Sequence, residues 1–369
     1  MKPVIIVSAH RSFLRGGVAT ITGECLKFLA QSYGNDFQIR VLVYQKELYP
    51  QLPNIDYIQF PNARKSFLYR VYYEYVYFKK LSKKWQPHLW LSMQDSTPNV
   101  QAKIRVVYLH NALPLEPLSW NYLTKSLHFF LLHFLYRRIY PLGIRKNNWI
   151  VLQQKSLANK LSDRFLISSN KILLFPTKIA TRINTTFIKI EKLKAYTFIY
   201  PATAFPYRNF EIIISAVKLL NNKGIHNLEV IFTIDGKENR YARGLKKKSS
   251  SNIIFKPFMP ANELYDLYKA VDCLLFPSFV ESWGLPLSEF MQTNKPILAA
   301  DLPYAHETTS EYERVKFFDP ENAEQLAEYM LQVMIGELVF DKNMASPEEK
   351  YETVHSWAEL FDKIVSLNP

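Results

Sequence analysis

Short apolar runs alternate with longer segments of helical periodicity in both halves of the chain. Residues 17–32 and 210–220 carry apolar side chains at three- and four-residue spacing, which is typical of helices packed on a sheet. The expected strands are short runs rich in Val, Ile and Leu. In the first half they are Val4–Val7, Ile39–Val43, Leu89–Ser92, Arg105–Leu109 and Trp149–Leu152. In the second half they are Thr197–Tyr200, Glu229–Thr233, Ile253–Phe255, Cys273–Phe276 and Pro296–Ala299, with Lys316–Phe318 as a further candidate. This alternation predicts an α/β fold with two doubly wound, Rossmann-like domains, each built on a parallel sheet.

The length of the chain supports a division into two domains. With 369 residues, of which 48% are hydrophobic, the chain exceeds what one core usually organises. A segment rich in Lys and Thr at 185–195 predicts the boundary, with an N-terminal domain over 1–190 and a C-terminal domain over 191–350. Residues 351–369 are expected to form a C-terminal helix that packs back toward the N-terminal domain, because their apolar side chains share one face.

Charge is distributed unevenly between the halves. Residues 1–195 contain 29 Lys and Arg against 9 Asp and Glu, a net charge of +20, whereas residues 196–369 contain 17 against 24, a net charge of −7. A basic half indicates an anionic partner such as nucleic acid, anionic lipid or a phosphorylated substrate, and an ordinary solvated basic surface is the alternative. The basic residues form no nucleic-acid recognition motif, which disfavours nucleic acid.

Cysteine usage and apolar segments indicate the compartment. Cys25 and Cys273 are far apart in the sequence, as is typical of thiols in a reducing compartment. The N-terminal apolar run is too short for a signal peptide, and the stretch 127–135 is shorter than the roughly 20 residues that a membrane-spanning helix needs. We expect a cytoplasmic protein, and peripheral contact with the inner face of the plasma membrane stays open.

Two carboxylates stand at the entrance of an expected helix in the second half. Glu281 and Glu289 flank Ser-Trp-Gly-Leu-Pro-Leu-Ser, and Pro286 favours the first turn of a helix that runs to Met291. Carboxylates accept hydrogen bonds from paired hydroxyls, so the two residues suit a sugar and a ribose, while the helix dipole attracts a phosphate. Without further context, a helix-capping carboxylate and an exposed Glu are the more common explanation of such a pair.

The residues around this pair supply the context. Pro277-Ser-Phe-Val-Glu-Ser-Trp-Gly-Leu-Pro-Leu-Ser-Glu-Phe-Met, followed by Lys295-Pro-Ile-Leu-Ala-Ala-Asp-Leu-Pro-Tyr-Ala-His-Glu, resembles the donor-site signature of the family 4 retaining glycosyltransferases. The resemblance implies the GT-B fold, in which two Rossmann-like domains face an interdomain cleft. It further implies that Glu281 contacts hydroxyls of the transferred sugar and that Glu289 holds the nucleotide ribose. Gly284 and Leu285 are assigned to donor binding by the same match.

A basic residue upstream fits the same signature. Arg208 lies where the family carries a Lys or Arg on the donor diphosphate, and its guanidinium can form two parallel hydrogen bonds to phosphate oxygens. The match also assigns the neighbouring Asn209 to donor binding. Many members have an Arg six residues earlier, where this chain has Ala202. That departure leaves part of the diphosphate charge without its usual partner, for which Arg240, Arg243 or a first-domain residue are candidates.

The first half contributes a glycine-containing loop directly after its first expected strand. The segment from Ser8 to Thr20 includes Arg15, Gly16 and Gly17 and resembles the glycine-rich loop of the same family. Backbone amides free of side chains at a helix N-terminus can approach a phosphate or an acceptor closely, whereas a tight strand-to-helix turn is the alternative. The resemblance implies donor binding by the two glycines and added acceptor-side charge from Arg15.

Two further loops of the first half resemble paired loops in members that build bacterial surface polysaccharides. They are Leu91–Val100 and Val106–Pro114. By position, His110 matches the family's cleft histidine beside the reacting sugar, where its ring could orient the donor or relay a proton. A satisfied structural histidine is the alternative. Asp95 and Asn111 are acceptor-side candidates from the same loops.

The expected mechanism needs neither a protein nucleophile nor a metal. No Asp or Glu on the first-half loops clearly fits the role of nucleophile for a covalent intermediate. The family is instead described with a front-face mechanism, in which the leaving diphosphate takes the acceptor proton while Arg208 and helix dipoles stabilise its growing charge. The sequence has no Asp-x-Asp pair, and its 8 His and 2 Cys show no ligand spacing, so we expect no metal and no cofactor.

Two first-half segments, 123–148 and 69–84, mix aromatic and basic residues. This mixture suits an interface with anionic lipid, where an acceptor on a polyprenyl diphosphate would be found, and a partly buried helix with a solvated end is the alternative. We predict a hexosyltransferase that moves a sugar from a nucleotide-sugar donor to a lipid-linked or other oligosaccharide acceptor in the synthesis of O-antigen, lipopolysaccharide or capsule. A nucleotide-sugar epimerase of the same architecture and a non-catalytic basic binding protein are the alternatives.

Overall fold

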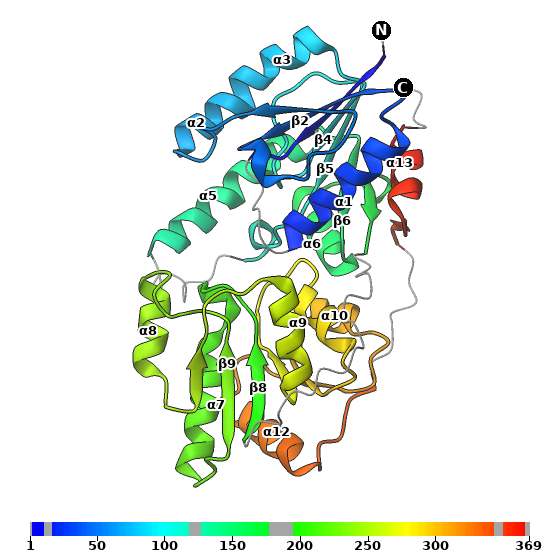
Figure 1. Ribbon diagram of the computed structural model, residues 1–369. Coiled ribbons are helices and arrows are strands. Elements are labelled where there is room, and N and C mark those ends of the chain that lie inside the picture. The colour runs from blue at the N-terminus through cyan, green and yellow to red at the C-terminus, as the bar shows by residue number, and fades with distance from the viewer. Residues whose placement is uncertain (1, 11–16, 118–126, 177–194, 343–349, 366–369) are drawn as a thin grey trace. The chain divides into compact units, whose positions relative to one another are not determined.

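The computed structural model describes residues 2–10, 17–117, 127–176, 195–342 and 350–365. The chain divides into two compact units. The first comprises Met1–Pro117, His133–Thr177 and Glu348–Pro369, and the second comprises Leu118–Leu132 and Lys178–Pro347. The predicted boundary near residue 190 falls outside the described residues. Each unit is an α/β structure built on one parallel sheet, as the hydrophobic pattern predicts (Figure 1).

The first unit is built on an eight-stranded sheet in the order β14-β7-β6-β5-β4-β1-β2-β3 (Figure 1). Its strands are β1 (Val4–Ser8), β2 (Gln38–Val43), β3 (Ile55–Gln59), β4 (Leu89–Ser92), β5 (Ile104–Tyr108), β6 (Trp149–Leu152), β7 (Ile172–Leu174) and β14 (Glu352–Thr353). Neighbouring strands pair in parallel, so that Ile5 lies beside Ile39 on one side and beside Leu89 on the other. Successive side chains of β1 enter different cores, because strand residues alternate between the faces of a sheet.

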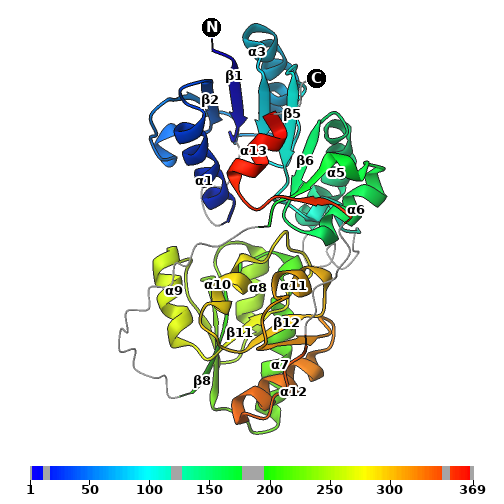
Figure 2. The same ribbon diagram turned by 90° about the vertical axis from the view of Figure 1, so that its right-hand side faces the viewer.

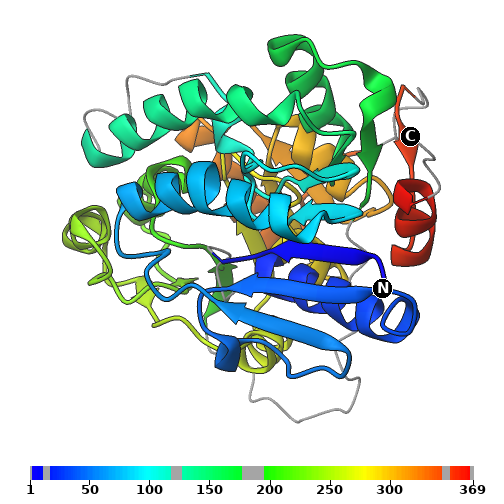
Figure 3. The ribbon, with the colours of Figure 1, turned by 90° about the horizontal axis from the view of Figure 1, so that it is seen from above.

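Helices cover both faces of this sheet. They are α1 (Gly17–Ser32), α2 (Phe67–Val71), α3 (Phe78–Trp85), α5 (Leu127–Ile144), α6 (Lys155–Phe165) and α13 (Trp357–Val365). Helices α1 and α13 lie on one face (Figure 2). They bury Leu26 and Phe361 in the same cluster. On the other face, the π-helical turn η2 (Tyr72–Tyr77) joins α2 and α3 into one continuous helix, which runs alongside the strands (Figure 3) and buries Phe78 against Trp90.

The C-terminal segment differs in part from the expected single helix. Residues Glu352 and Thr353 form β14, which pairs with β7, and only then does α13 begin. A two-residue strand with exposed side chains leaves no hydrophobic pattern to detect. Helix α13 belongs to the first unit, where the Phe361 ring lies 5.6 Å from Phe28 and 5.7 Å from Tyr33.

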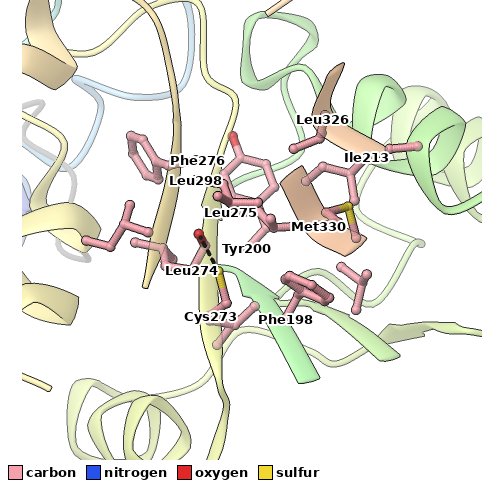
Figure 4. Close-up of a cluster of buried hydrophobic side chains, with 14 of the residues drawn as sticks. Phe198, Tyr200, Ile213, Cys273, Leu274, Leu275, Phe276, Leu298, Leu326 and Met330 are labelled. Atoms are coloured by element: carbon pink, nitrogen blue, oxygen red, sulfur yellow. Dashed lines mark hydrogen bonds between the residues drawn. The ribbon is translucent and has the colours of Figure 1, made fainter. Parts of the chain in front are cut away.

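The second unit is built on a six-stranded parallel sheet in the order β10-β9-β8-β11-β12-β13. Its strands are β8 (Tyr196–Tyr200), β9 (Leu228–Phe232), β10 (Ile253–Phe255), β11 (Cys273–Phe276), β12 (Ile297–Ala300) and β13 (Val315–Phe318). Its helices are α7 (Phe210–Asn222), α8 (Arg240–Lys248), α9 (Ala261–Ala270), α10 (Leu285–Met291), α11 (Pro303–Thr308) and α12 (Ala323–Ile335). Side chains of β8 and β11 meet those of α7 and α12 in one core, including Ile213 and Met330 (Figure 4).

The predicted strands are all present, each with its ends within one residue of the expected position. The prediction of two doubly wound parallel sheets is confirmed. The prediction misses β3, β7 and β14, two of them for physical reasons. Strand β3 is an edge strand whose side chains stay partly or fully exposed, and β14 has only 2 residues, both exposed. Strand β7 is a buried run of three apolar residues, as short as the predicted β10, so its pattern is detectable.

Candidate active site

The strand order of the second unit reverses between its central strands β8 and β11. The chain builds outward from β8 through β9 to β10 on one side and from β11 through β12 to β13 on the other. In open parallel sheets, ligands bind beyond the carboxyl ends of the strands at such a reversal. Arg208 follows β8 and Glu281 follows β11. The sheet order therefore brings two residues that are distant in sequence to the place where a ligand is expected.

Arg208 and Glu281 form an ion pair between the Nη1 and Oε1 atoms. The same Nη1 atom lies 3.3 Å from Oγ of Ser278. The two charged side chains are 20% and 9% exposed, so their contact is shielded from water for the most part. Nε of Arg208 is buried and has no hydrogen-bond partner within the described residues. The guanidinium thus has an unused donor that an incoming anion can satisfy.

The backbone around the ion pair is fixed by hydrogen bonds between the two loops. The Tyr200 hydroxyl donates to the Arg208 carbonyl at 2.6 Å, and the Phe279 N–H donates to the Tyr207 carbonyl at 2.9 Å. Burial raises the pKa of Tyr200, so this phenol stays protonated and remains a donor. The guanidinium carbon of Arg208 also lies 5.0 Å from the centre of the Tyr207 ring. These contacts hold Arg208 in one orientation.

Asn209 connects the loop after β8 with the loops after β11 and β13. Its backbone is left-handed, with φ of 55°, a conformation that Asn tolerates better than most residues. Its Nδ2 atom donates to the carbonyl of Pro277 at 3.3 Å and to that of Pro320 at 2.8 Å. The side chain is therefore engaged within the protein and fixes the entry to α7. A direct contact of Asn209 with the donor stays a prediction.

Helix α10 begins at Leu285 with Pro286 in its first turn, as the sequence predicts. The residue before it, Gly284, has φ of 81°, which an L-amino acid rarely adopts. A Cβ atom at Gly284 would lie 3.1 Å from Cδ1 of Leu287 and 3.4 Å from Cε1 of Phe276. The backbone conformation favours glycine here, because the chain turns sharply between Glu281 and the helix, and a Cβ would in addition press on the Leu287 side chain.

Glu289 lies on α10 and is held by two tyrosines of α9 that the sequence reading misses. The Tyr265 hydroxyl donates to Oε1 at 3.1 Å, and the Tyr268 hydroxyl donates to Oε2 at 3.2 Å. Burial and the Glu289 charge raise the pKa of Tyr268 well above its usual value, so it remains a donor. The two phenols orient the carboxylate. In the sequence they are indistinguishable from ordinary core residues at helical spacing.

The strand order of the first unit reverses between β1 and β4. Of the predicted residues after β1, Arg15 and Gly16 lie outside the described residues, and Gly17 is the first residue of α1. After β4 comes Asp95, whose backbone is left-handed with φ of 65°. The first unit therefore has its own sheet edge where ligands are expected, and two of the acceptor-side candidates, Asp95 and Asn111, follow its strands β4 and β5.

Asp95 and His110 belong to one buried arrangement. The Asp95 carboxylate accepts the backbone N–H groups of His110 and of Asn111, the latter at 2.9 Å. Burial raises the pKa of Asp95 to about 6, although these two hydrogen bonds act in the opposite direction. The His110 ring stacks on Tyr108 with ring centres 4.5 Å apart. The carboxylate thus positions the backbone that carries His110.

The His110 imidazole is neutral and has a nitrogen that is available for hydrogen bonding. Burial lowers the pKa of His110 to about 3. Its Nε2 atom is buried and has no hydrogen-bond partner in the part of the chain that the structure describes. A neutral ring of this kind can accept or donate a hydrogen bond to a substrate hydroxyl. Asn111, by contrast, uses its Oδ1 atom to accept the Leu113 N–H at 3.0 Å.

A second polar cluster at this edge is missed by the sequence reading. Glu74 lies on η2 and is only 2% exposed, and its Oε1 accepts from Nε of Arg70 at 3.1 Å and Nε2 of Gln94 at 3.3 Å. The buried His10, which follows β1, lies 3.8 Å from the same oxygen. Glu74 is the one acidic residue between Asp56 and Asp95, which is the signal that could have identified it.

The described residues contain neither a candidate membrane span nor a candidate group of metal ligands. Among these residues, no helix is both long enough and apolar enough to cross a membrane. Nor do three or more His, Cys, Asp or Glu side chains gather there as a set of metal ligands. Transfer without a metal ion stays a prediction, tested below.

Comparison with known proteins assigns the second half of the chain. Residues 182–351 match the family described as Glycosyl transferases group 1. The O-antigen chain mannosyltransferase RfbU of Salmonella typhimurium is 22% identical over 177 residues, which cover 47% of this chain and 47% of the relative. The matched region thus spans about half the length of that curated relative.

Solved structures of glycosyltransferases resemble the chain over 90% or more of its length. WaaG, a glycosyltransferase involved in lipopolysaccharide biosynthesis, has a TM-score of 0.65 at 16% identity, covering 90% of this chain and 90% of its own. A glycosyltransferase from Rickettsia africae has a TM-score of 0.65 at 14% identity, covering 91% of this chain and 88% of its own. Anabaena Alr3699/HepE in complex with UDP and glucose has a TM-score of 0.64 at 13% identity, with 90% of each chain covered. Residues 182–351 are therefore a glycosyl transferases group 1 domain, within a chain that has the two-domain α/β fold of GT-B glycosyltransferases.

Proposed function

We propose that this protein is a retaining glycosyltransferase that moves a sugar from a nucleotide-sugar donor to an acceptor in the synthesis of a cell-surface polysaccharide. The observation that carries the proposal is the convergence of Arg208 and Glu281 at the reversal point of the second sheet. Glu289 on the adjoining helix adds an oriented carboxylate. The family of residues 182–351 and the names of the relatives support the same activity.

The ion pair suggests how a donor is received. Without donor, Arg208 and Glu281 neutralise each other. A diphosphate carries more negative charge than one carboxylate and offers oxygens for two parallel hydrogen bonds, so it competes for the guanidinium. Glu281 then becomes available to hydroxyls of the transferred sugar, and Glu289 accepts from the ribose. Binding of the donor is thus coupled to release of the carboxylate that recognises its sugar.

The same arginine stabilises the leaving group in the proposed front-face reaction. As the bond from the sugar to the diphosphate breaks, the phosphate oxygens gain negative charge, which Arg208 stabilises in a site largely shielded from water. The acceptor hydroxyl attacks from the same face and gives its proton to the leaving phosphate oxygen. On the acceptor side, the neutral His110 ring offers a hydrogen bond to a sugar hydroxyl.

A panel of nucleotide sugars tests the donor site directly. A ligand at about 100 times its dissociation constant stabilises a protein by roughly 2.7 kcal/mol, which a thermal-shift assay detects. At least one nucleotide sugar should raise the melting temperature of the wild type, and Arg208→Ala and Glu289→Ala should each diminish that shift. Glu281→Ala should lower the turnover rate strongly and the folding stability only slightly. The absence of a shift with every nucleotide sugar would count against the proposal.

The stereochemistry and metal requirement are tested with the donor that this panel identifies. Nuclear magnetic resonance of the first-formed product should show the anomeric configuration of the donor, and turnover should persist in a chelator. An inverted product excludes a retaining reaction. An epimerised nucleotide sugar would favour the epimerase alternative, and activity that is lost in chelator and restored by manganese or magnesium would overturn the metal-independent part of the proposal.

A further inference from the structure

Glu74 is the acidic residue of the continuous helix formed by α2, η2 and α3, and its side chain is buried. It is 2% exposed, and its Oε1 atom accepts a hydrogen bond from Nε of Arg70 at 3.1 Å. A buried carboxylate costs free energy unless charged or hydrogen-bonding partners compensate for the lost water, and apolar residues in place of such a pair are often as stable or more stable. Folding stability alone is therefore a poor explanation for a carboxylate at this position.

Glu74 binds the loop after β4 at two places. We refer to residues 93–99 of this loop as the Asp95 loop. Nε2 of Gln94 donates to Oε1 of Glu74 at 3.3 Å, and the N–H of Asn99 donates to the backbone carbonyl of Glu74 at 2.8 Å. The first contact lies one residue before Asp95 and the second lies four residues after it. A single helical residue thus holds the loop on both sides of Asp95.

The Asp95 loop needs support because of its backbone conformation. Asp95 has φ of 65°, a left-handed conformation that is unfavourable for an L-residue and persists where the surroundings fix it. Further along the loop, Oγ1 of Thr97 accepts from Nδ2 of the buried Asn147 at 2.7 Å. Gly143 lies so close to the loop that a Cβ atom there would be 2.6 Å from the Thr97 carbonyl oxygen. The loop is therefore held by η2 and by the C-terminal end of α5.

The Asp95 loop in turn fixes the backbone that carries His110. The Asp95 carboxylate accepts the backbone N–H groups of His110 and Asn111. We propose that Glu74 is a positioning residue, which holds the Asp95 loop and through Asp95 keeps the His110 ring in place for a sugar hydroxyl. The hold on the loop is independent of what the protein does, whereas the part that His110 plays in sugar transfer rests on the proposed function.

Hydrogen exchange followed by mass spectrometry tests the hold on the loop. In Glu74→Leu and in Gln94→Leu, the amides of residues 109–112 should exchange roughly tenfold faster or more, because a hydrogen bond to a charged group is lost. The amides of residues 104–108, which include β5, are the internal reference and should change less. Gln94→Leu leaves the pair of Arg70 and Glu74 intact, so its effect cannot come from a buried arginine without its carboxylate.

Leu29→Ala is the matched control for a general loss of stability. Leu29 lies on α1, fully buried in the cluster that α1 shares with α13, so its truncation destabilises the first unit without removing a contact of the Asp95 loop. It should change the exchange of residues 104–108 and 109–112 by the same factor. The hold is overturned if residues 109–112 stay as protected in both loop variants as in the wild type, relative to residues 104–108, or if Leu29→Ala exposes them to the same degree as Glu74→Leu.

A double-mutant cycle on turnover tests whether Glu74 acts through His110. The probe is the nucleotide sugar that stabilises the wild type, and release of its nucleoside diphosphate in water measures turnover. Glu74→Leu and His110→Ala should each be about tenfold slower than the wild type or worse, as expected when a hydrogen bond to the sugar is lost or misplaced. The double variant should be as slow as His110→Ala alone. Rate losses that multiply would contradict positioning through His110.

The nucleotide-sugar thermal shift of the same proteins separates the two proposals. Glu74→Leu keeps the donor residues of the second unit, so it should keep the full shift. Faster exchange confined to residues 109–112, with no shift of the wild type by any nucleotide sugar, would sink the proposed function and the catalytic part of this proposal, and would leave the hold on the loop intact. A normal shift with wild-type protection of residues 109–112 in Glu74→Leu would do the reverse.

Discussion

Replacement of Gly284 by alanine tests whether the turn between Glu281 and α10 is as constrained as its geometry indicates. Gly284 has φ of 81°, where an L-residue costs about 1–2 kcal/mol. The new Cβ would also lie 3.1 Å from Leu287, which is fully buried, and 3.4 Å from Phe276, which is 1% exposed. The separation of 3.4 Å is ordinary contact, whereas that of 3.1 Å requires the buried Leu287 side chain to shift, and overpacking of this kind typically costs about 1–3 kcal/mol. Gly284→Ala should therefore lower the free energy of unfolding by about 2–5 kcal/mol.

Gly336→Ala is the matched control. Gly336 follows α12 with φ of 79°, and nothing lies within 4 Å of the position that a Cβ would occupy. The conformational cost is the same as in Gly284→Ala and the steric cost is absent. Gly336→Ala should therefore lower the free energy of unfolding by only about 1–2 kcal/mol. Urea denaturation measures the change in free energy of unfolding of each variant relative to the wild type, provided that the m-value is unchanged.

Donor affinity distinguishes a local defect from a general one. Gly284→Ala displaces the loop that carries Glu281, so it should weaken nucleotide-sugar binding, whereas Gly336→Ala should leave binding unchanged. The reasoning is refuted if Gly284→Ala is no less stable than Gly336→Ala, or if it binds the donor with wild-type affinity.

Three further substitutions probe the supports of the site. Asn209→Ala removes the hydrogen bonds to the carbonyls of Pro277 and Pro320 and leaves alanine at a φ of 55°. Urea denaturation should therefore show a free energy of unfolding that is lower by about 2–4 kcal/mol. A stability equal to that of the wild type would contradict the role given to the Asn209 amide. Tyr265→Phe removes a hydrogen bond of 3.1 Å to the Glu289 carboxylate. Hydrogen bonds to charged groups contribute about 1.5–3 kcal/mol to stability, so urea denaturation should show a loss in this range, and calorimetry should show weaker donor binding because the carboxylate is less well oriented. Tyr312→Phe, whose hydroxyl donates to the Lys295 carbonyl, is the control and should bind the donor like the wild type. Asp95→Asn tests the buried carboxyl through its pH dependence. Because burial raises the pKa of Asp95 from 3.8 to about 6, the folded protein binds this proton more tightly than the unfolded chain, and the charged form costs stability above pH 6. As the pH falls from 7 toward 4, the free energy of unfolding of the wild type should therefore rise relative to that of Asp95→Asn by about 2–3 kcal/mol, and a difference that is constant with pH would contradict the burial argument.

The fold could be predicted from the sequence because both sheets are parallel and covered by helices. Strands that are buried on both faces, such as Ile297–Ala300, appear as continuous apolar runs with clear ends. Edge strand β3 and the two-residue strand β14 lack that signal, since their side chains are largely exposed and their pairing is specified by neighbours in the sheet.

The candidate site could be predicted residue by residue but not as an arrangement. The motif around Glu281 and the position of Arg208 mark each residue separately, whereas their mutual ion pair depends on β8 lying next to β11. The tyrosines that hold Glu289 come from another helix and carry no motif of their own. Glu74 lies in a π-helical turn and is buried there, and no sequence periodicity reports such a turn.

Calorimetric titration of UDP and GDP into the wild type and Arg208→Ala tests the central claim most directly. Truncation of a charged residue that contacts a buried partner costs about 2–5 kcal/mol, and the loss of Arg208 also leaves the Glu281 charge uncompensated beside the phosphates. At least one nucleoside diphosphate should bind the wild type, and Arg208→Ala should bind it roughly 30-fold more weakly or worse. Arg314→Ala, an exposed arginine of the same unit, should bind like the wild type. Equal affinity of Arg208→Ala and wild type for the diphosphate would contradict a donor site at the reversal between β8 and β11.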